Sequence, residues 1–430
     1  MSEAIPNLRH LRLLQGVVQC GSVSAAARAM HMTQPAVTQA INGLEIALQS
    51  RLFRRSPRCM EPTAAGRILA HRIVRCLNQL HEGCVEAAGQ RMAATGADPF
   101  RTLPGITPTQ LRVMIGVAVQ GSIGAAARTL GIARSSAHCA VRDLERVLGN
   151  TLFEQTSFGL RATREAGRLA RRALLAFAEI DQARAEIAAL AGQESGRTII
   201  GAMPLARSRL VPTAVLTFAA RRPGHAVSIL DGSYESMVDA LRRGSADILV
   251  GALRDPVPHP DIVQELLFDD PLSLLVRMGH PLAGQARPTL RDLSGYAWIA
   301  PRRGSPLRHQ YEVLVEKIEP PTHSPVQAPI ECNSLMAARA LLLASDRVML
   351  LSAHQAYFEL AAGQLTALAH PLGRVSRPIG LTVRRDWAPT ETQAILVDLL
   401  RDQAKAQPRL HCRSHGTDAA RRAFSRRRNG

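Results

Sequence analysis

The sequence lacks several features that would place it among membrane, secreted or metal-binding proteins. No stretch of its 430 residues approaches the roughly 18 apolar residues that a membrane span requires, and its first residues contain no apolar signal core. Its seven cysteines are scattered without C-x-x-C spacing, which indicates neither a zinc site nor a disulfide framework. We therefore expect a cytoplasmic chain that holds no metal and no cofactor.

Catalytic constellations are also missing. The sequence shows no nucleophile paired with a base and no glycine-rich phosphate loop, and His225, His259 and His280 lie outside any recognisable motif. An isolated histidine is more often a hydrogen-bonded or exposed side chain than a catalytic group. We therefore expect that the chain is not an enzyme, and an α/β enzyme carrying a helical interaction module is the alternative hypothesis.

Positive charge is what the sequence has in excess. The formal net charge is +18, of which about +9 lies in residues 1–196 and about +7 in residues 401–430, so the middle of the chain is nearly neutral. This distribution predicts a polyanionic partner for the N-terminal part. The arginine-rich tail, residues 405–430, is predicted to be disordered, and it either adds nonspecific DNA affinity or simply keeps the chain soluble.

Residues 21–53 predict two short helices that meet at a tight turn. The first helix is rich in alanine and follows Ser22, and the second begins near Thr33. Apolar side chains occupy one face of the second helix, at Val37, Ile41, Leu44 and Leu48. The other side carries uncharged side chains that suit base edges in a DNA major groove, which predicts a recognition helix. The DNA-binding residues predicted in this helix are Thr33, Gln34, Pro35, Thr38, Gln39 and Asn42.

A basic run just past this helix predicts a wing. Arg54, Arg55 and Arg58 would grip phosphate or the minor groove beside the recognition helix. Taken together, Gly21-Ser22, Ala26-Ala27, Gln34-Pro35-Ala36-Val37, Leu44-Glu45, Leu52-Phe53-Arg54 and Thr63-x-x-Gly66 closely resemble the winged helix-turn-helix of LysR-type transcriptional regulators. The resemblance implies double-stranded promoter or operator DNA and a small-molecule effector as partners, and a homodimer or homotetramer as the assembly.

The resemblance also assigns a role to the long helix predicted from residue 63 to about residue 92. In the family this is the dimerisation helix, and the alternative is a solvated helix packed on its own domain. Residues 94–108 contain two glycines and three prolines and are predicted to be a linker. The first domain is therefore placed at residues 1–93.

The sequence then repeats itself. A shift of 100 residues superposes residues 8–53 on residues 108–153 with roughly 16 of 46 positions identical, in phase with the helical pattern. A second winged unit with its own linker helix is therefore predicted at residues 106–192. Its contact positions differ, because Arg134-Ser135 replaces Gln34-Pro35, His138 replaces Thr38 and Glu154-Gln155 replaces Arg54-Arg55. We expect a degenerate copy that faces protein, and the alternative is a reader of a second DNA segment.

From residue 197 onwards, short apolar strands alternate with helices, which is typical of a parallel α/β sheet. The strands are predicted at residues 198–201, 226–230, 247–251, 298–301 and 348–352. This part is similar to the LysR-type effector domain, whose two-lobed fold is that of periplasmic solute-binding proteins (type 2). The predicted fold is therefore multidomain, with tandem α-helical winged helix-turn-helix units followed by an α/β effector domain at residues 197–404. Its lobes are placed at 197–270 plus 373–404 and at 271–372.

Ligands of open α/β sheets bind outside the carboxyl ends of the strands, where backbone amides of the following helices are free. Arginines at these loops favour an anionic effector. Each residue could equally cap a helix or lie as a solvated charge. The predicted effector-binding residues are Leu205, Ala206, Arg207, Ser208, Gly232, Ser233, Arg302, Gly304, Ser305, Arg308, Asn333 and Ser334. The sequence thus predicts a ligand-responsive transcription factor in which a small molecule closes the two lobes and alters how DNA is bound.

Overall fold

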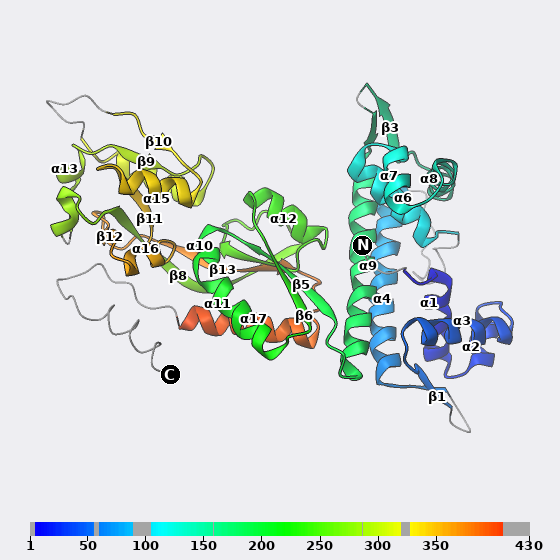
Figure 1. Cartoon of the computed structure of the whole chain (residues 1–430). Helices are drawn as coiled ribbons and strands as arrows, with labels where there is room; N and C mark the ends of the chain where they lie inside the picture. Colours follow the sequence, from blue (N-terminus) through cyan, green and yellow to red (C-terminus); the bar gives the residue numbers. More distant parts are fainter. Residues whose placement is uncertain are drawn as a thin grey trace. The chain divides into compact units, whose positions relative to one another are not determined.

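The N-terminal and C-terminal parts of the chain fold from different kinds of element (Figure 1). The computed structural model describes residues 5–55, 60–88, 105–157, 159–285, 287–319 and 327–406. It contains two compact units, of which the first spans residues 1–197 with two short later segments and the second contains the rest. Residues 407–430 of the predicted tail, and all of the predicted linker before residue 105, lie outside the described residues.

The first winged unit has the helix and strand order that the sequence predicts. Ser22 begins the second helix, because its Oγ accepts a hydrogen bond from the Ala25 N–H at 3.1 Å. Thr33 immediately precedes the third helix, with Pro35 in its first turn. The elements are α1 (Leu8–Cys20), α2 (Val23–Ala29), α3 (Gln34–Ala47), β1 (Phe53–Arg55), β2 (Met60–Pro62) and α4 (Ala64–Ala88).

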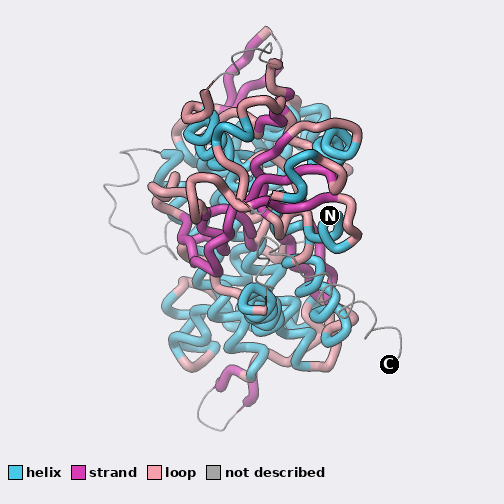
Figure 2. The backbone as a smooth tube through the Cα atoms, turned by 90° about the vertical axis from the view of Figure 1, so that its left-hand side faces the viewer, coloured by secondary structure: helices cyan, strands magenta, loops and turns pink. Residues whose placement is uncertain are grey.

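The second winged unit repeats this order, which confirms the predicted duplication. Ser122 caps its second helix through the Ala125 N–H at 3.3 Å, as Ser22 does in the first unit. Figures 1 and 2 show the two wing hairpins at opposite ends of the N-terminal unit. The elements are α6 (Pro108–Gln120), α7 (Ile123–Leu130), α8 (Arg134–Leu148), β3 (Phe153–Thr156), β4 (Gly159–Ala162) and α9 (Arg164–Leu190).

The two long helices, α4 and α9, pack against each other along their length. Their contacts run in opposite directions along the chain: Arg72 of α4 meets Glu186 of α9, whereas Glu86 of α4 meets Arg172 of α9. The two helices are therefore antiparallel. Apolar side chains on both helices are buried in one core shared by the two winged units. Helix α4 is therefore paired with α9, which belongs to the second predicted domain and not to the domain of α4.

The second compact unit is built on a sheet of nine strands among the described residues. The sheet is mixed and not wholly parallel as predicted: β5 pairs in parallel with β7 and β9 with β11, whereas β8 and β13 run antiparallel to their neighbours β11 and β7. Neither β8 nor β13 was predicted. The strands are β5 (Gly196–Ala202), β6 (His225–Leu230), β7 (Ile248–Ala252), β8 (Ile262–Arg277), β9 (Trp298–Ala300), β10 (Ile330–Glu331), β11 (Val348–Ser352), β12 (Leu365–Leu368) and β13 (Ser376–Arg384).

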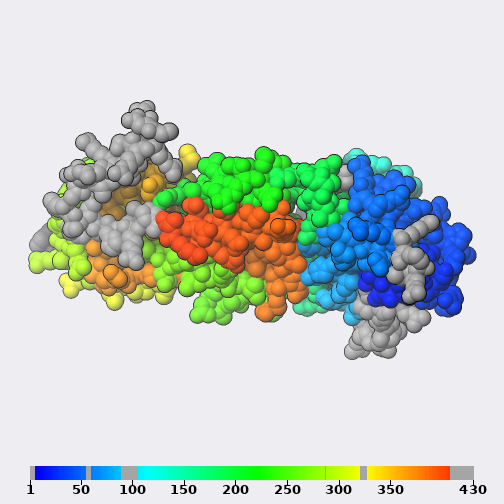
Figure 3. Space-filling view, turned by 90° about the horizontal axis from the view of Figure 1, so that it is seen from below, coloured from blue at the N-terminus to red at the C-terminus, as the bar shows by residue number. Residues whose placement is uncertain are grey.

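Helices cover both faces of the sheet in the first lobe. Ile248 and Val250 of β7 pack into a core with α11 and α17, whereas Leu249 points to the opposite face and packs with α12. Figure 3 shows α17, in orange to red, beside the green surface of α11. The helices of this unit are α10 (Pro204–Ser208), α11 (Leu210–Arg221), α12 (Tyr234–Arg242), η1 (Pro281–Gly284), α13 (Leu290–Leu293), α14 (Pro306–Val315), α15 (Leu335–Leu343), α16 (Tyr357–Ala361) and α17 (Glu391–Lys405).

Strands β8 and β13 connect the core of the first lobe to a separate core in residues 272–368. At this junction Asp270 is fully buried, and its carboxylate accepts hydrogen bonds from the Ser352 hydroxyl at 2.5 Å and from Arg377 at 3.0 Å. A buried carboxylate is tolerated only when its oxygens are paired in this way. None of the described helices is long and apolar enough to cross a membrane.

Candidate nucleic-acid interface and effector site

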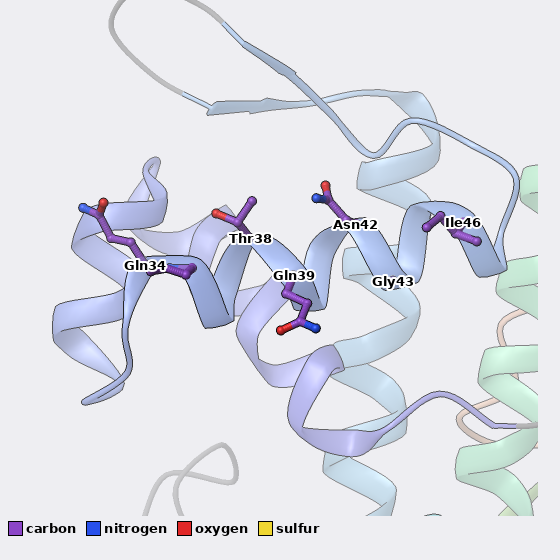
Figure 4. A pocket seen from close by; sticks show the side chains of 7 residues that line it. Gln34, Thr38, Gln39, Asn42, Gly43 and Ile46 are labelled. Carbon is purple, nitrogen blue, oxygen red and sulfur yellow. The ribbon is translucent and has the colours of Figure 1, made fainter.

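The exposed side of α3 forms a shallow surface groove (Figure 4). Thr38 and Asn42 project from one side of the helix, because residues four apart share a helix face. The opposite face is fixed in the core by Val37, Ile41 and Leu44. The residues that line the groove are Gln34, Pro35, Thr38, Gln39, Asn42, Gly43 and Ile46.

The predicted contact residues of α3 are accessible to a partner. Thr33, Gln34, Pro35, Gln39 and Asn42 are exposed and Thr38 is half-buried. The Gln34 side-chain amide donates a hydrogen bond to the Ser24 hydroxyl of α2, which holds it across the turn between the two helices. Ile46, at 77% exposure, was not predicted and ends the groove on an apolar side chain.

Hydrogen bonds at the end of α3 fix the helix against its wing. The Glu45 carboxylate accepts the Leu52 N–H at 2.8 Å and pairs with Arg51 at 3.0 Å. The Thr63 N–H then donates to the Leu52 carbonyl at 2.9 Å. A Cβ on Gly66 would lie 2.1 Å from that same carbonyl oxygen, so only glycine fits. The Leu44-Glu45 and Thr63-x-x-Gly66 motifs therefore position the wing.

The first wing is a two-stranded hairpin. Arg54 is exposed on β1 and lies opposite Glu61 of β2 in the antiparallel register. Arg55 ends β1, but its side chain is not among the described ones, and Arg58 lies outside the described residues. The structure thus places Arg54 on the wing of the same unit as α3. The DNA contacts of Arg55 and Arg58 stay predictions.

The second winged unit presents a different surface. Arg134, His138 and Arg142 are exposed on α8. On its wing, Glu154 forms an ion pair with Arg161 at 2.8 Å, and both side chains are more than half exposed. Glu154 stands where the first wing has Arg54, and Arg161 lies directly opposite Glu154 on the neighbouring strand and balances its charge.

Predicted effector residues of the first lobe lie at the start of α10 and of α12. Leu205 and Ala206 are buried, so only their backbone groups can face a ligand. Arg207 forms an ion pair with Asp231, and the Ser208 hydroxyl donates to the Gln355 carbonyl of the second lobe at 2.8 Å. Ser208 therefore forms a hydrogen bond between the two lobes.

At the start of α12, Gly232 is exposed and Ser233 accepts a hydrogen bond from the Ser236 N–H at 3.1 Å. The pKa of the Glu235 carboxyl lies below its ordinary value, because it accepts its own backbone N–H and the Ser233 hydroxyl, with the positive charge of Arg302 as a further cause. Arg254 is a further positive charge that lowers this pKa.

Predicted residues of the second lobe fall into two groups. Arg302, Gly304 and Asn333 are exposed, whereas Ser305 and Ser334 cap α14 and α15, which is the structural alternative that the sequence left open. The remaining residue, Arg308, donates to Glu312 at 2.6 Å, to Glu331 at 3.3 Å and to the Pro301 carbonyl at 3.1 Å. Its guanidinium is largely committed to the protein.

Aromatic side chains also make contacts between the lobes, and these were not predicted. The Arg209 guanidinium lies 4.6 Å from the centre of the Tyr357 ring, and the Phe268 and His354 rings meet edge to face at 5.9 Å. Neither pair could be found from sequence, since the partners are separated by more than 80 residues. No group of His, Cys, Asp and Glu side chains among the described residues is arranged to hold a metal ion.

Family models match both parts of the chain. The model described as "LysR substrate binding domain" matches residues 191–405. The model described as "Bacterial regulatory helix-turn-helix protein, lysR family" matches twice, at residues 8–67 and 108–167.

Two curated relatives differ in how much of the chain they align with. The HTH-type transcriptional regulator GalR of Pseudomonas putida is 30% identical over 400 residues, covering 92% of this chain and 97% of the relative. The HTH-type transcriptional regulator PcaQ of Agrobacterium fabrum is 29% identical over 294 residues, covering 68% of this chain and 94% of the relative. Because of its length, the first alignment must span both winged units.

Solved structures share the fold at lower identity. Full-length OxyR from Pseudomonas aeruginosa is 21% identical with a TM-score of 0.52, covering 73% of this chain and 98% of that chain. ArgP from Mycobacterium tuberculosis is 19% identical with a TM-score of 0.54, covering 70% of this chain and 98% of that chain. At these identities the likeness concerns the fold alone.

Proposed function

Since the chain belongs to the LysR family of transcriptional regulators, we propose that α3 and its wing make the main DNA contact and that a small molecule bound between the lobes controls it. The chain is a DNA-binding transcriptional regulator with an effector-binding domain, and it is not an enzyme. The residues of the two sites, the chemistry of the effector and the assembly are our proposals.

The observation that supports the DNA site best is the uncharged, exposed polar side of α3. Glutamine and asparagine side chains can bind adenine through paired hydrogen bonds in the major groove, while arginines on a wing meet phosphate or the minor groove. A solvated helix face without function would more often carry charged side chains. The proposed contacts are Thr33, Gln34, Pro35, Thr38, Gln39, Asn42, Arg54, Arg55 and Arg58.

Binding-site selection from random duplexes, followed by titration of the selected duplex, tests this site. Gln34→Ala should cost about 1–3 kcal/mol of discrimination at one base pair. Arg54→Ala should weaken all sequences alike and reduce the salt slope by about one. Gln19→Ala is the matched control, because Gln19 is an exposed glutamine at the end of α1. Wild-type affinity and salt slope in both test variants would exclude this surface as the DNA contact.

For the effector site, we propose a small anionic ligand held near the contacts between the lobes. Arg207 and Arg302 supply positive charge from different lobes, and helix starts at Ser233 and Ser305 supply backbone amides. Leu205 and Ala206 would contribute backbone groups only, since their side chains are buried. Gly232, Ser208, Gly304, Asn333 and Ser334 complete the proposed set, in which Arg308 would act mainly through its charge.

Thermal unfolding of the full chain with a panel of small carboxylic acids and their uncharged amides tests this proposal. A binder at about 100 times its dissociation constant should stabilise the effector domain by roughly 2.7 kcal/mol. Arg302→Ala should abolish that shift, whereas Arg303→Ala should not, because the neighbouring Arg303 is 83% exposed and reaches Glu331 only at 3.7 Å. Equal stabilisation by acids and amides would contradict an anionic ligand.

Coupling between the sites would follow from closure of the lobes. A ligand can shift this equilibrium only through contacts that differ between the open and closed arrangements. The Ser208–Gln355 and Arg209–Tyr357 contacts join the lobes and are suited to change on closure. We propose the domain division 1–93, 94–108, 106–192, 197–404 and 405–430, a cytoplasmic location, and a homodimer or homotetramer.

A further inference from the structure

We propose that the two winged units of one chain form an internal dimer that binds a single DNA duplex, with α3 and α8 reading two different half-sites. This inference rests on the proposed DNA contact of α3 and extends it to the second unit. It places within one polypeptide an arrangement that otherwise requires two chains, and it makes the DNA site asymmetric.

The evidence begins with two equivalent arginines in the α4–α9 pair. Arg72 of α4 and Arg172 of α9 are separated by the 100-residue period of the repeat. Each donates to three acceptors on the opposite helix. Arg72 reaches Glu179 at 2.8 Å, Gln182 at 2.6 Å and Glu186 at 2.9 Å. Arg172 reaches Gln79 at 2.9 Å, Glu82 at 2.8 Å and Glu86 at 3.1 Å.

These two networks are related by a pseudo-twofold axis. Adding 100 to positions 79, 82 and 86 gives 179, 182 and 186, so each contact made by Arg72 has a counterpart made by Arg172. Reciprocal contact of this kind, in which residue i meets j and the equivalent of j meets the equivalent of i, defines an isologous dimer interface. Here both halves belong to the same chain.

The interface is also specific in its packing. The Arg72 side chain is only 3% exposed, and a buried guanidinium is stable only when its donors are satisfied. A Cβ on Gly83 would lie 2.7 Å from the Arg172 Cβ, so glycine permits the close approach of the two helices. Between these points both helices bury apolar side chains in the shared core. An incidental contact would leave polar groups unpaired and gaps between the helices.

A twofold pair of winged units is suited to two successive turns of one DNA groove. In Figure 1 both helix-turn-helix units lie on the same side of the α4–α9 pair, at its opposite ends. Helix α4 contains 25 residues, which corresponds to about 37 Å at 1.5 Å per residue. Dimeric helix-turn-helix proteins read half-sites about 34–36 Å apart. The length of the paired helices therefore matches the spacing of two half-sites.

The contact face of α8 has the chemistry of a reader with a different preference. Arg134, His138 and Arg142 replace Gln34, Thr38 and Asn42, and all three are exposed. They follow each other at intervals of four residues and so share one helix face. Arginine bound to guanine O6 and N7 is the commonest specific major-groove contact, whereas glutamine and asparagine suit adenine. The two half-sites should therefore differ in sequence.

The second wing does not oppose this binding. In the first wing Arg54 lies opposite Glu61, and in the second wing the same pair is transposed, with Glu154 opposite Arg161. The two cross-strand pairs thus carry the same sum of charge. The negative charge at position 154, which favoured a protein-facing copy on sequence grounds, is matched by its neighbour.

Site selection with the full-length chain tests the inference. The recovered duplex should contain two dissimilar half-sites about one helical turn apart. Arg134→Ala and Arg142→Ala should each lose about 5- to 150-fold discrimination at guanine positions of one half-site only. Gln34→Ala should act on the other half-site. Arg146→Ala is the control, since Arg146 is an exposed α8 arginine already paired with Asp143.

The outcomes separate the two proposals. Failure to recover any specific duplex, or unchanged selection by Gln34→Ala, would contradict the proposed DNA contact of α3. An inverted repeat of one half-site, or silent Arg134→Ala and Arg142→Ala variants beside an active Gln34→Ala effect, would overturn the internal dimer alone. Circular dichroism of each variant verifies that these exposed substitutions leave the fold intact.

Zero-length cross-linking tests whether the pairing lies within one chain. Treatment of the Arg172→Lys variant with a carbodiimide should join the introduced amine to Glu82 or Glu86, which lie 2.8 and 3.1 Å from the native guanidinium, and the product should keep the mass of a single chain on a denaturing gel. The unsubstituted chain is the control, because an arginine at position 172 does not form this amide. Cross-linked dimers as the main product would show that α4 pairs with α9 of another chain, and the internal dimer would be wrong.

Discussion

Removing the Arg72 guanidinium should destabilise the N-terminal unit far more than removing its equivalent, Arg172. The Arg72 side chain is 3% exposed and its acceptors Glu179 and Glu186 are 11% and 22% exposed, so Arg72→Ala removes a buried guanidinium from two largely buried carboxylates, of which Glu179 keeps its ion pair with Arg75 at 2.8 Å. Breaking a buried ion pair from one side costs about 3–5 kcal/mol. Arg172 is 25% exposed and its partners lie nearer solvent, so Arg172→Ala should cost about 1 kcal/mol.

Urea unfolding of the full chain can isolate this effect. Both tryptophans of the sequence, Trp298 and Trp387, lie in the C-terminal unit, so tryptophan fluorescence reports on that unit alone. Helical circular dichroism reports on both units. The N-terminal unit therefore gives a transition that circular dichroism detects and tryptophan fluorescence does not. With a slope of about 2 kcal/mol per molar urea, Arg72→Ala should lower the urea midpoint of that transition by about 2 M, and Arg172→Ala by about 0.5 M.

The fluorescence transition should stay unchanged in both variants, which makes it an internal control for global effects. If Arg72→Ala moves the dichroism midpoint no further than Arg172→Ala does, the buried network does not hold the two winged units together. Equal movement of the fluorescence transition would also refute the reasoning, since the damage would then not be confined to the N-terminal unit.

Three further predictions concern single positions. Gly131 has φ 66° with open space around it, so Gly131→Ala should cost about 1 kcal/mol through backbone strain alone, and an unchanged dichroism midpoint would contradict this. Burial raises the pKa of the Cys84 thiol to about 12. Iodoacetamide at pH 8 should therefore label exposed Cys20 but not Cys84, which peptide mass spectrometry can measure. Equal labelling of the two cysteines would contradict the burial of Cys84. Burial lowers the pKa of His280, so the side chain takes up a proton when the protein unfolds at low pH. The free energy of unfolding, followed by tryptophan fluorescence, should therefore fall as the pH drops below about 6.5. His280→Gln should reduce that dependence, and an identical pH profile would contradict this prediction.

Local rules predicted the winged units well, because their signals lie within a few residues. Ser22 caps α2, and the apolar repeat through Val37, Ile41 and Leu44 forms the buried face of α3. The same rules failed at β8, where Asp269-Asp270-Pro271 resembles a turn. The strand continues there because Arg377 and Ser352, each more than 80 residues away, satisfy the buried Asp270 carboxylate.

Pairing over long distances also limited what sequence could say about the sites. The α4 sequence does not reveal whether its partner is a second chain or α9 of the same chain, because both provide a similar helix. In the effector domain, Arg308 resembled a ligand-binding arginine, yet Glu331 from another element occupies part of its guanidinium. Exposed positions on α3 were predictable because a solvent-facing helix side needs no partner in the fold.

Hydroxyl-radical footprinting of the full-length chain on its selected duplex tests the central claim most directly, namely that one chain reads DNA with two winged units. We predict two protected patches about one helical turn apart, the first lost in Gln34→Ala and the second in the Arg134→Ala, Arg142→Ala double variant. A single protected patch, or two patches that both depend on Gln34 and neither on the α8 arginines, would contradict the account.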